Sequence, residues 1–220
     1  MYSAAIDPAP DKVGFSLLCD DKVIVSVNCA MKGRAASALS SFILDELAKA
    51  GVAVQNIERW SVGAGPGSFT GLRQAAALVA GWCFGRENVL RRCVPGAVAL
   101  AAAAEPADGE VVSCIYDGRN KEVLYYNVKC SAGDYIPTDE YGVLNAEQAE
   151  EFFAGFNGKA ICFSSELDAV KKIIPESVDL LTADTAAPEV LAQVKSVAFD
   201  NDLTRLVYIR PAVYLPEMKG

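Results

Sequence analysis

The residues most able to do chemistry form one glycine-rich segment, Gly63-Ala64-Gly65-Pro66-Gly67-Ser68-Phe69-Thr70-Gly71-Leu72-Arg73. Glycine adopts backbone angles that side chains forbid, so such a loop can aim amide N–H groups at an anion, helped by the N-terminus of a following helix. The same segment also fits a structural turn in which the hydroxyl of Ser68 or Thr70 caps that helix. Both interpretations, a phosphate cradle and a structural turn, stay open at this point.

The segment departs from the common glycine motifs. It is not a P-loop, because no Gly-Lys-Ser/Thr stands at its end. Counted from Gly63 or Gly65, the third glycine of the dinucleotide fingerprint is replaced by Ser68 or Thr70. Ser68 also lacks the glycines two residues before and after it that a nucleophile elbow requires. Two aspartates, Asp7 and Asp117, are further candidates to lie near a nucleotide.

The composition excludes several classes of protein. The chain contains no histidine, which removes the commonest general base, the commonest metal ligand and the base of any Ser-His or Cys-His pair. Its net charge of −8 makes it a poor candidate to hold RNA alone, because RNA binding depends on Lys and Arg neutralising phosphates. We therefore expect no metal site, and we expect any RNA chemistry to need a basic partner.

Cysteine usage and hydropathy point to a cytoplasmic protein. The seven cysteines are odd in number and scattered, and no Cys-x-x-Cys pair occurs, so we expect reduced structural thiols. No apolar run reaches the roughly 20 residues that span a bilayer. The first residues lack the basic start and long apolar stretch of a signal peptide.

Hydrophobic periodicity predicts the elements that position the glycine-rich segment. In the first half we expect strands at 3–6, 13–19, 22–27, 57–62 and 89–93, and helices at 39–50, 72–84 and 98–104. In the second half we expect strands at 110–116, 122–130, 135–138, 159–163 and 206–215, and helices at 146–153, 167–174 and 188–197. Both halves follow the order three strands, helix, strand, helix. The sequence thus predicts a duplicated α/β fold with one lobe at 1–104 and a smaller lobe at 105–220, whose terminal segment can pack back on the first.

The helix after the loop carries small residues at close helical spacing, namely Gly71, Ala75, Ala76, Ala80 and Gly81. Small residues let another helix approach closely. Two interpretations fit, burial inside this chain and an interface with another subunit. Under the second, we expect a contact surface made of Leu72, Arg73, Ala75, Ala76, Val79, Ala80 and, from the preceding helix, Phe42.

The run from Gly65 to Arg73 resembles the signature of the TsaB family, also called YeaZ. The likeness extends to Asp7 in the first strand, to the helix end at 46–51, to Asp117-Gly118-Arg119 and to Tyr208-Ile209-Arg210-Pro211. The chain departs from the family where Pro8 follows Asp7 and where Phe163-Ser164-Ser165 replaces glycines. These departures weaken the expectation of ATP contacts from the second lobe.

The resemblance implies a two-lobed α/β fold of the actin-like, ribonuclease-H-like class that includes sugar kinases and heat-shock-70 proteins. It implies a non-catalytic scaffold, with no catalytic residue of its own, for making threonylcarbamoyladenosine beside the anticodon of tRNAs that read codons beginning with adenine. The implied partners are the catalytic paralogue TsaD, the ATPase TsaE and, through the same helices, a second copy of the chain. The resemblance also implies that tRNA is met only through the complex, with no membrane contact.

No intrinsic cofactor is implied by this resemblance, and ATP is expected only at the interface with the partners. One alternative from a different class is a small ATP-dependent kinase-like enzyme that uses Asp7 or Asp117 on a hydroxyl substrate. A glycoprotease-like peptidase is disfavoured, because its metal site needs histidines and this chain has none.

Overall fold

The computed structural model describes residues 1–8, 12–30 and 35–210. Within the first sheet, Asp20 and Asp21 form the turn of a β-hairpin. Both aspartates have positive φ angles, 47° and 64°, which suit the tight turns whose twist matches that of paired strands. The hairpin joins β2 (Lys12–Cys19) to β3 (Lys22–Ala30). Residues 20 and 21, which separate the strands predicted at 13–19 and 22–27, therefore form a turn.

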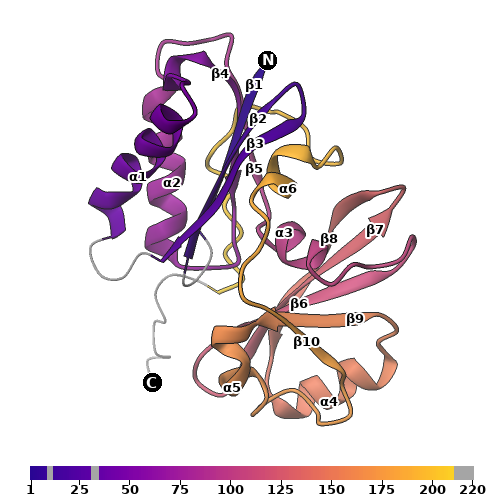
Figure 1. The fold of residues 1–220 in the computed structure, drawn as a ribbon. Helices are drawn as coiled ribbons and strands as arrows, with labels where there is room; N and C mark the ends of the chain where they lie inside the picture. Colours follow the sequence, from indigo (N-terminus) through magenta and orange to yellow (C-terminus); the bar gives the residue numbers. More distant parts are fainter. Residues whose placement is uncertain (9–11, 31–34, 211–220) are drawn as a thin grey trace, which may run out of the picture.

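The first sheet has five strands in the order β3-β2-β1-β4-β5 (Figure 1). Its other strands are β1 (Tyr2–Pro8), β4 (Ile57–Gly63) and β5 (Leu90–Val94). Neighbouring strands β1, β2 and β3 are antiparallel, whereas β4 and β5 run parallel to β1. The helices α1 (Ala35–Lys49) and α2 (Phe69–Trp82) cover one face of this sheet, and a short 3-10 turn, η1 (Val54–Asn56), precedes β4.

The second sheet repeats this arrangement in the order β10-β9-β6-β7-β8. Its strands are β6 (Val111–Asp117), β7 (Val123–Ser131), β8 (Asp134–Leu144), β9 (Lys159–Phe163) and β10 (Leu180–Ala183). The accompanying helices are α4 (Ala146–Gly155), η2 (Ser164–Glu166) and α5 (Leu167–Val170). The predicted repeat of three strands, helix, strand, helix is confirmed.

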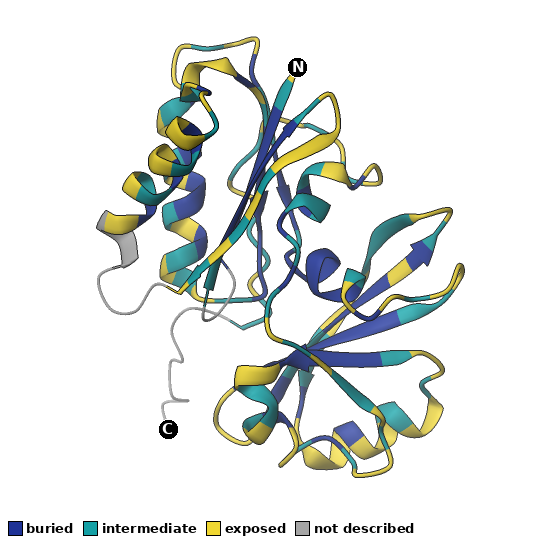
Figure 2. Cartoon of the chain, viewed as in Figure 1, coloured by how far each residue is buried: buried dark blue, intermediate teal, exposed yellow. Residues whose placement is uncertain are grey.

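Two short helices lie between the sheets. α3 (Ala97–Ala102) follows β5, and α6 (Glu189–Gln193) follows β10. In α3, residues 97–101 are completely buried, and they share one hydrophobic core with Ala5 and Val94 of the first sheet and Val112 of the second. A separate core, around Trp60, fills the space between the first sheet and its two helices (Figure 2). β1 is buried along almost its whole length because elements cover both of its faces.

Several elements differ from the expectation. The short strand expected at 135–138 is the long strand β8, whereas the helices expected at 167–174 and 188–197 are the short α5 and α6. α6 stops because Val194 is extended and the N–H groups of Lys195 and Ser196 donate to the Asp134 carboxylate.

The terminal strand expected at 206–215 is absent from its described part. Residues 206–210 form no strand. Their one backbone bond to the glycine-rich segment joins Val207 N–H to Ala64 O at 2.8 Å, and side chains make the other contacts. Residues 211–215 lie outside the described residues. Within the part of the chain that the structure describes, no helix is long and apolar enough to cross a membrane.

Candidate functional site

The glycine-rich loop leaves β4 through a sharp, well-fixed bend at Gly65. Its φ is +101°, and a Cβ there would lie 3.0 Å from Leu72 Cδ1 and 3.1 Å from Val207 O. The Gly65 carbonyl accepts the N–H of Gly96 at 2.8 Å, and Ala64 N–H donates to Val94 O at 2.7 Å. Both the angle and the crowding demand glycine. Position 67 does not require glycine, since its φ is not left-handed and the atom nearest to a Cβ there would be Pro8 O at 3.6 Å.

The loop ends as α2 begins. Ser68 is the N-cap residue, and its carbonyl accepts the Leu72 N–H at 3.0 Å, but its hydroxyl makes no capping bond. Thr70 already lies within the helix, and its side chain is exposed, as is that of Ser68. Ser68 therefore occupies the helix-capping position that the structural-turn interpretation predicts, but its hydroxyl does not make the predicted capping bond. Both hydroxyls remain available to solvent.

A cleft of about 660 Å³ lies between the loop and the second lobe. Its walls come from the loop, the β6–β7 turn, η2, α5 and the C-terminal segment. They include Gly67, Ser68, Phe69, Thr70, Tyr116, Asp117, Arg119, Asn120, Ser165, Glu166, Val207, Ile209 and Arg210. Of the residues predicted near a nucleotide, Gly67, Ser68, Thr70 and Asp117 are thus brought together. Asp7 and Gly65 lie outside these walls.

The β6–β7 turn that faces the loop has a specific backbone. Asp117 Oδ1 accepts the N–H of Arg119 at 2.8 Å, and the three residues 119–121 all have positive φ angles. A Cβ at Gly118 would lie 2.8 Å from Glu122 O, so glycine is required there. Arg210 fixes the turn from the C-terminal segment, because its guanidinium donates to Gly118 O at 2.7 Å and pairs with Glu122.

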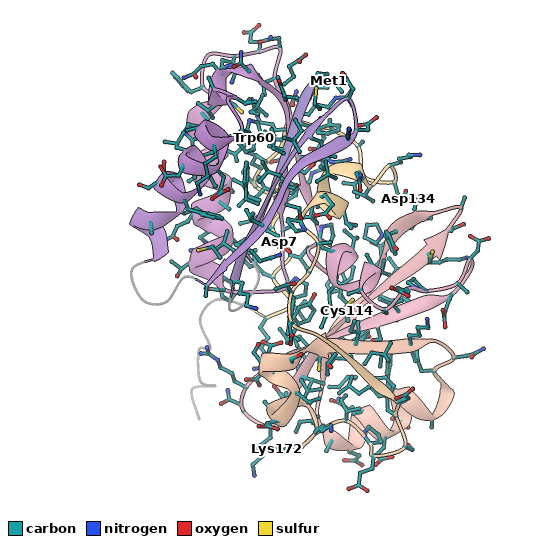
Figure 3. All side chains as sticks on the ribbon, viewed as in Figure 1. Met1, Asp7, Trp60, Cys114, Asp134 and Lys172 are labelled. Carbon is teal, nitrogen blue, oxygen red and sulfur yellow. The ribbon has the colours of Figure 1, made fainter. Side chains whose placement is uncertain are left out.

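Asp7 lies on β1 where the first lobe meets the second (Figure 3). It is 6% exposed, and its Oδ1 would be 2.5 Å from a Cβ at Gly63 and 3.1 Å from one at Gly96. Burial raises the pKa of this carboxyl to about 7. Asp7 therefore faces closely packed backbone behind the glycine-rich loop.

The charges that face the cleft nearly cancel. Arg119 and Arg210 contribute two positive charges, and Asp117 and Glu166 contribute two negative ones. Arg210 is further neutralised by its ion pair with Glu122. The phosphates of a nucleoside triphosphate carry several negative charges and favour a surface of opposite sign. These walls therefore offer no net positive charge to a phosphate group. No group of three or more His, Cys, Asp or Glu side chains is placed to hold a metal ion within residues 1–8, 12–30 and 35–210.

Sequence reasoning missed the contribution of the C-terminal segment to this cleft. Tyr208 stacks on Phe69 with ring centroids 4.8 Å apart, and its hydroxyl accepts a hydrogen bond from Arg73 Nε at 3.2 Å. Glu166 was also missed as a cleft residue. The sequence predicted that the terminal segment packs back on the first lobe, but neither this prediction nor the likeness of 208–211 to a family segment placed it at the cleft.

The predicted contact helix requires a correction. Leu72, Ala75, Ala76 and Val79 are buried in this chain's own structure, at 7% exposure or less. Ala75, Ala76 and Val79 belong to the core beneath α2, and the half-buried Phe42 packs against that core. Spacing alone could not tell which small residues faced inward. The outward face of α2 consists of Arg73, Ala77, Ala80 and Gly81, and Phe84 follows it.

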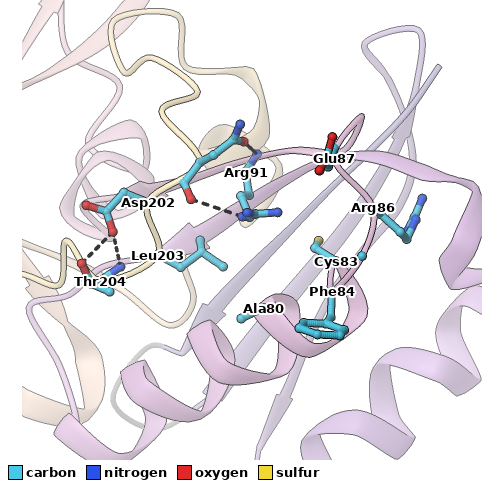
Figure 4. A pocket seen from close by; sticks show the side chains of 11 residues that line it. Ala80, Cys83, Phe84, Arg86, Glu87, Arg91, Asp202, Leu203 and Thr204 are labelled. Atoms are coloured by element: carbon cyan, nitrogen blue, oxygen red, sulfur yellow. Dashed lines mark hydrogen bonds between the residues drawn. The ribbon is translucent and has the colours of Figure 1, made fainter.

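Phe84 stands at the end of this outward face and is 89% exposed. Beside it lies a pocket of about 430 Å³ between the end of α2, the start of β5 and the C-terminal segment (Figure 4). The wall opposite the helix is held by Asn201, whose backbone N–H donates to Arg91 O and whose Oδ1 accepts the Arg91 N–H, both at 2.9 Å. Ala80, Phe84 and this pocket form one continuous outer surface.

The comparisons with known proteins agree with this architecture. Residues 34–141 match the family model described as TsaD, tRNA N6-adenosine threonylcarbamoyltransferase. A Pseudomonas aeruginosa structure described as similar to peptidase YEAZ shares 22% identity and a TM-score of 0.76, over 95% of this chain and 99% of that one. The YeaZ structure from Pseudomonas aeruginosa also shares 22% identity, with a TM-score of 0.75, over 94% and 99% of the two chains. No curated protein matches the sequence. The fold is α/β with two similar sheets, as expected, and it is shared with these YeaZ structures.

Proposed function

We propose that this chain is a non-catalytic scaffold. The premise is that the family match and the nearly full-length structural matches support a TsaB/YeaZ-type protein related to threonylcarbamoyladenosine biosynthesis. In this proposal it acts in the cytoplasm and binds a TsaD-like catalytic paralogue. A TsaE-like ATPase joins the pair, ATP binds at their shared interface, and tRNA is held by the complex rather than by this acidic chain.

The outer surface of α2 carries this proposal. Ala77, Ala80 and Gly81 present little side chain to solvent, so a second helix can approach the backbone closely. Phe84 leaves 89% of its surface in water, which contributes nothing to the stability of a monomer. Exposed aromatic residues of this kind act as anchors at protein interfaces. An apolar helix face that ends in an aromatic side chain therefore favours a protein partner.

The cleft supports the non-catalytic part of the proposal. Its facing charges sum to about zero, and Asp7 points into packed backbone instead of toward substrate. The absence of histidine removes the usual general base. A partner must then supply the catalytic groups.

The test is size-exclusion chromatography with light scattering, on the chain alone and mixed with the TsaD-like paralogue of its organism. We expect a heteromeric species to replace the separate proteins. Ala80→Glu should weaken pairing about 30-fold or more, because an unpaired carboxylate buried in an interface costs at least about 2 kcal/mol. Ala80 is exposed in the free chain, so circular dichroism should report an intact fold. Ala154→Glu, at an exposed position of α4, is the matched control and should pair normally.

Three outcomes would count against the proposal. Normal pairing by Ala80→Glu would place the interface elsewhere. Failure of the wild-type chain to pair in the presence of tRNA and nucleotide would contradict the scaffold. Magnesium-dependent ATP turnover by the pure chain that disappears in Asp7→Asn would favour the kinase-like enzyme instead.

A further inference from the structure

A buried arginine ties the C-terminal part of the chain to the first sheet. Arg92 of β5 is 2% exposed, and it donates to Ser61 Oγ at 2.9 Å and to the carbonyls of Leu191 and Ala192 at 3.0 Å each. It also donates to Val197 O. Burial lowers the pKa of Arg92 to about 10, so the guanidinium remains charged at neutral pH. A buried charge that loses its hydrogen-bond partners is costly, which makes these carbonyls difficult to remove.

The ring of Phe199 completes this clamp. Its centroid lies 4.2 Å from Arg92 Cζ, within the range of a cation–π contact. Just beyond it, Asn201 pairs with the backbone of Arg91, as described above. We name residues 184–210, which follow β10, the strap. The strap is thus held to Arg91 and Arg92 of β5 on the first sheet.

The start of the strap contacts β2 and β3, at the edge of the first sheet opposite β5. Pro188 packs so closely on β2 that its Cβ would lie 3.0 Å from a Cβ at Gly14. Ser26 Oγ donates to Glu189 Oε2 at 2.6 Å, and Asn28 Nδ2 donates to Ala186 O at 3.2 Å, both from β3. The strap therefore crosses this sheet from β3 to β5 on the face opposite α1 and α2.

The same strap is also bonded to the second lobe. Asp134 of β8 accepts the N–H groups of Lys195 and Ser196 at 3.0 and 2.8 Å. At its far end, Arg210 holds Gly118 and Glu122 of the β6–β7 turn. Leu191, which precedes Lys195 in the strap, lies in the core that includes residues of both sheets. Any change in the angle between the lobes would break these bonds and expose part of that core.

We propose that the strap locks the two lobes into one rigid body, so that the cleft between them does not open and close. A clamshell motion needs a hinge of few residues and an interface that can separate. Here the lobes share a hydrophobic core, and one segment is hydrogen-bonded to both. The inference concerns the isolated chain and does not depend on the proposed partner.

The first test measures the distance between the lobes by pulsed electron paramagnetic resonance. Spin labels would be attached to p-acetylphenylalanine placed at two exposed positions, Ser41 of α1 and Glu150 of α4, because seven native cysteines preclude thiol labelling. We expect a single narrow distance distribution that is unchanged by millimolar magnesium-ATP. Two populations, or a shift on adding nucleotide, would overturn the lock.

The second test asks whether Arg92 holds the strap, using hydrogen exchange followed by mass spectrometry. Arg92→Met should speed exchange about tenfold or more in peptides covering 189–201, while peptides from α1 stay unchanged, because only local opening becomes easier. Arg86→Met is the matched control, since Arg86 donates to the carbonyls of Gln55 and Ile57, outside the strap, and it should leave strap exchange unchanged. Phe199→Leu removes only the ring and tests the clamp if Arg92→Met does not fold. Strap exchange equal to wild type in both clamp variants would refute the role of Arg92.

Discussion

Replacing Asp7 with asparagine should change how the stability of the protein depends on pH. In the native chain the Asp7 carboxyl is buried under Gly63 and Gly96, and its pKa is raised from 3.8 to about 7. The native state therefore keeps this proton over a pH range in which the unfolded chain has already lost it. The stabilisation that follows is complete below the unfolded pKa and is lost as the pH rises through the folded pKa.

The magnitude follows from the same two values. Their difference of about 3 corresponds to about 4 kcal/mol over the whole titration. Between about pH 5 and about pH 8, linkage gives a loss of about 3 kcal/mol in the free energy of unfolding of the wild type. Asparagine cannot ionise, so Asp7→Asn should lack this loss. Any constant cost of placing an amide in this site affects both pH values equally.

Urea unfolding of both proteins at the two pH values measures the effect. With a slope of about 3 kcal/mol per molar urea, the wild-type midpoint should fall by about 1 M relative to Asp7→Asn on going to the higher pH. Asp202→Asn is the control, because hydrogen bonds from Thr204 lower the pKa of the Asp202 carboxyl and move its titration below this range. Parallel pH profiles for the wild type and Asp7→Asn would refute the reasoning.

Two further predictions concern the loop and the tail. Gly65→Ala should lower the free energy of unfolding by about 1–3 kcal/mol, since φ is +101° and a Cβ meets Leu72 and Val207. Gly67→Ala should change this free energy little. Thermal melts compare the two variants, and equal losses of stability would contradict this prediction. Tyr208→Ala should cost about 1 kcal/mol by removing the stacking on Phe69, and Tyr208→Phe should keep most of that energy; urea unfolding measures both, and equal losses would assign the energy to the hydroxyl.

Much of the fold could be predicted because each element carries a local signal. The turn at Asp20 and Asp21 and the turn after Asp117 both separate alternating or apolar runs, and both are hairpins in the structure. The order of elements in the two halves then indicates the duplicated sheet. The lengths of the short helices could not be predicted, because tertiary contacts end them. α6 stops at Gln193 since Asp134, distant in sequence, captures the next N–H groups.

The candidate site could be predicted only in part. The loop from Gly65 to Thr70 stands out by composition, and Asp117 belongs to a segment that resembles the family. Which small residues of α2 face inward could not be predicted, because Ala76 and Ala80 differ only in position around the helix. Ala76 lies over Trp60 and the rest of the first core, whereas Ala80 lies on the surface. The tail at Tyr208 reaches the cleft through contacts with Phe69 and Arg73, which no local pattern encodes.

The late position of the strap in the chain affects how the protein folds during its synthesis on the ribosome. The strands of the first sheet are all made once Val94 has been synthesised, but α6, which covers the other face, begins only at Glu189. At about 5–20 residues per second, the 94 residues between them (95–188) take about 5 to 20 seconds. During that interval the nascent sheet shows an uncovered apolar face, a natural target for chaperones. A message truncated before the strap would leave that face permanently open, and the product should be recognised by quality control even though all ten described strands are complete.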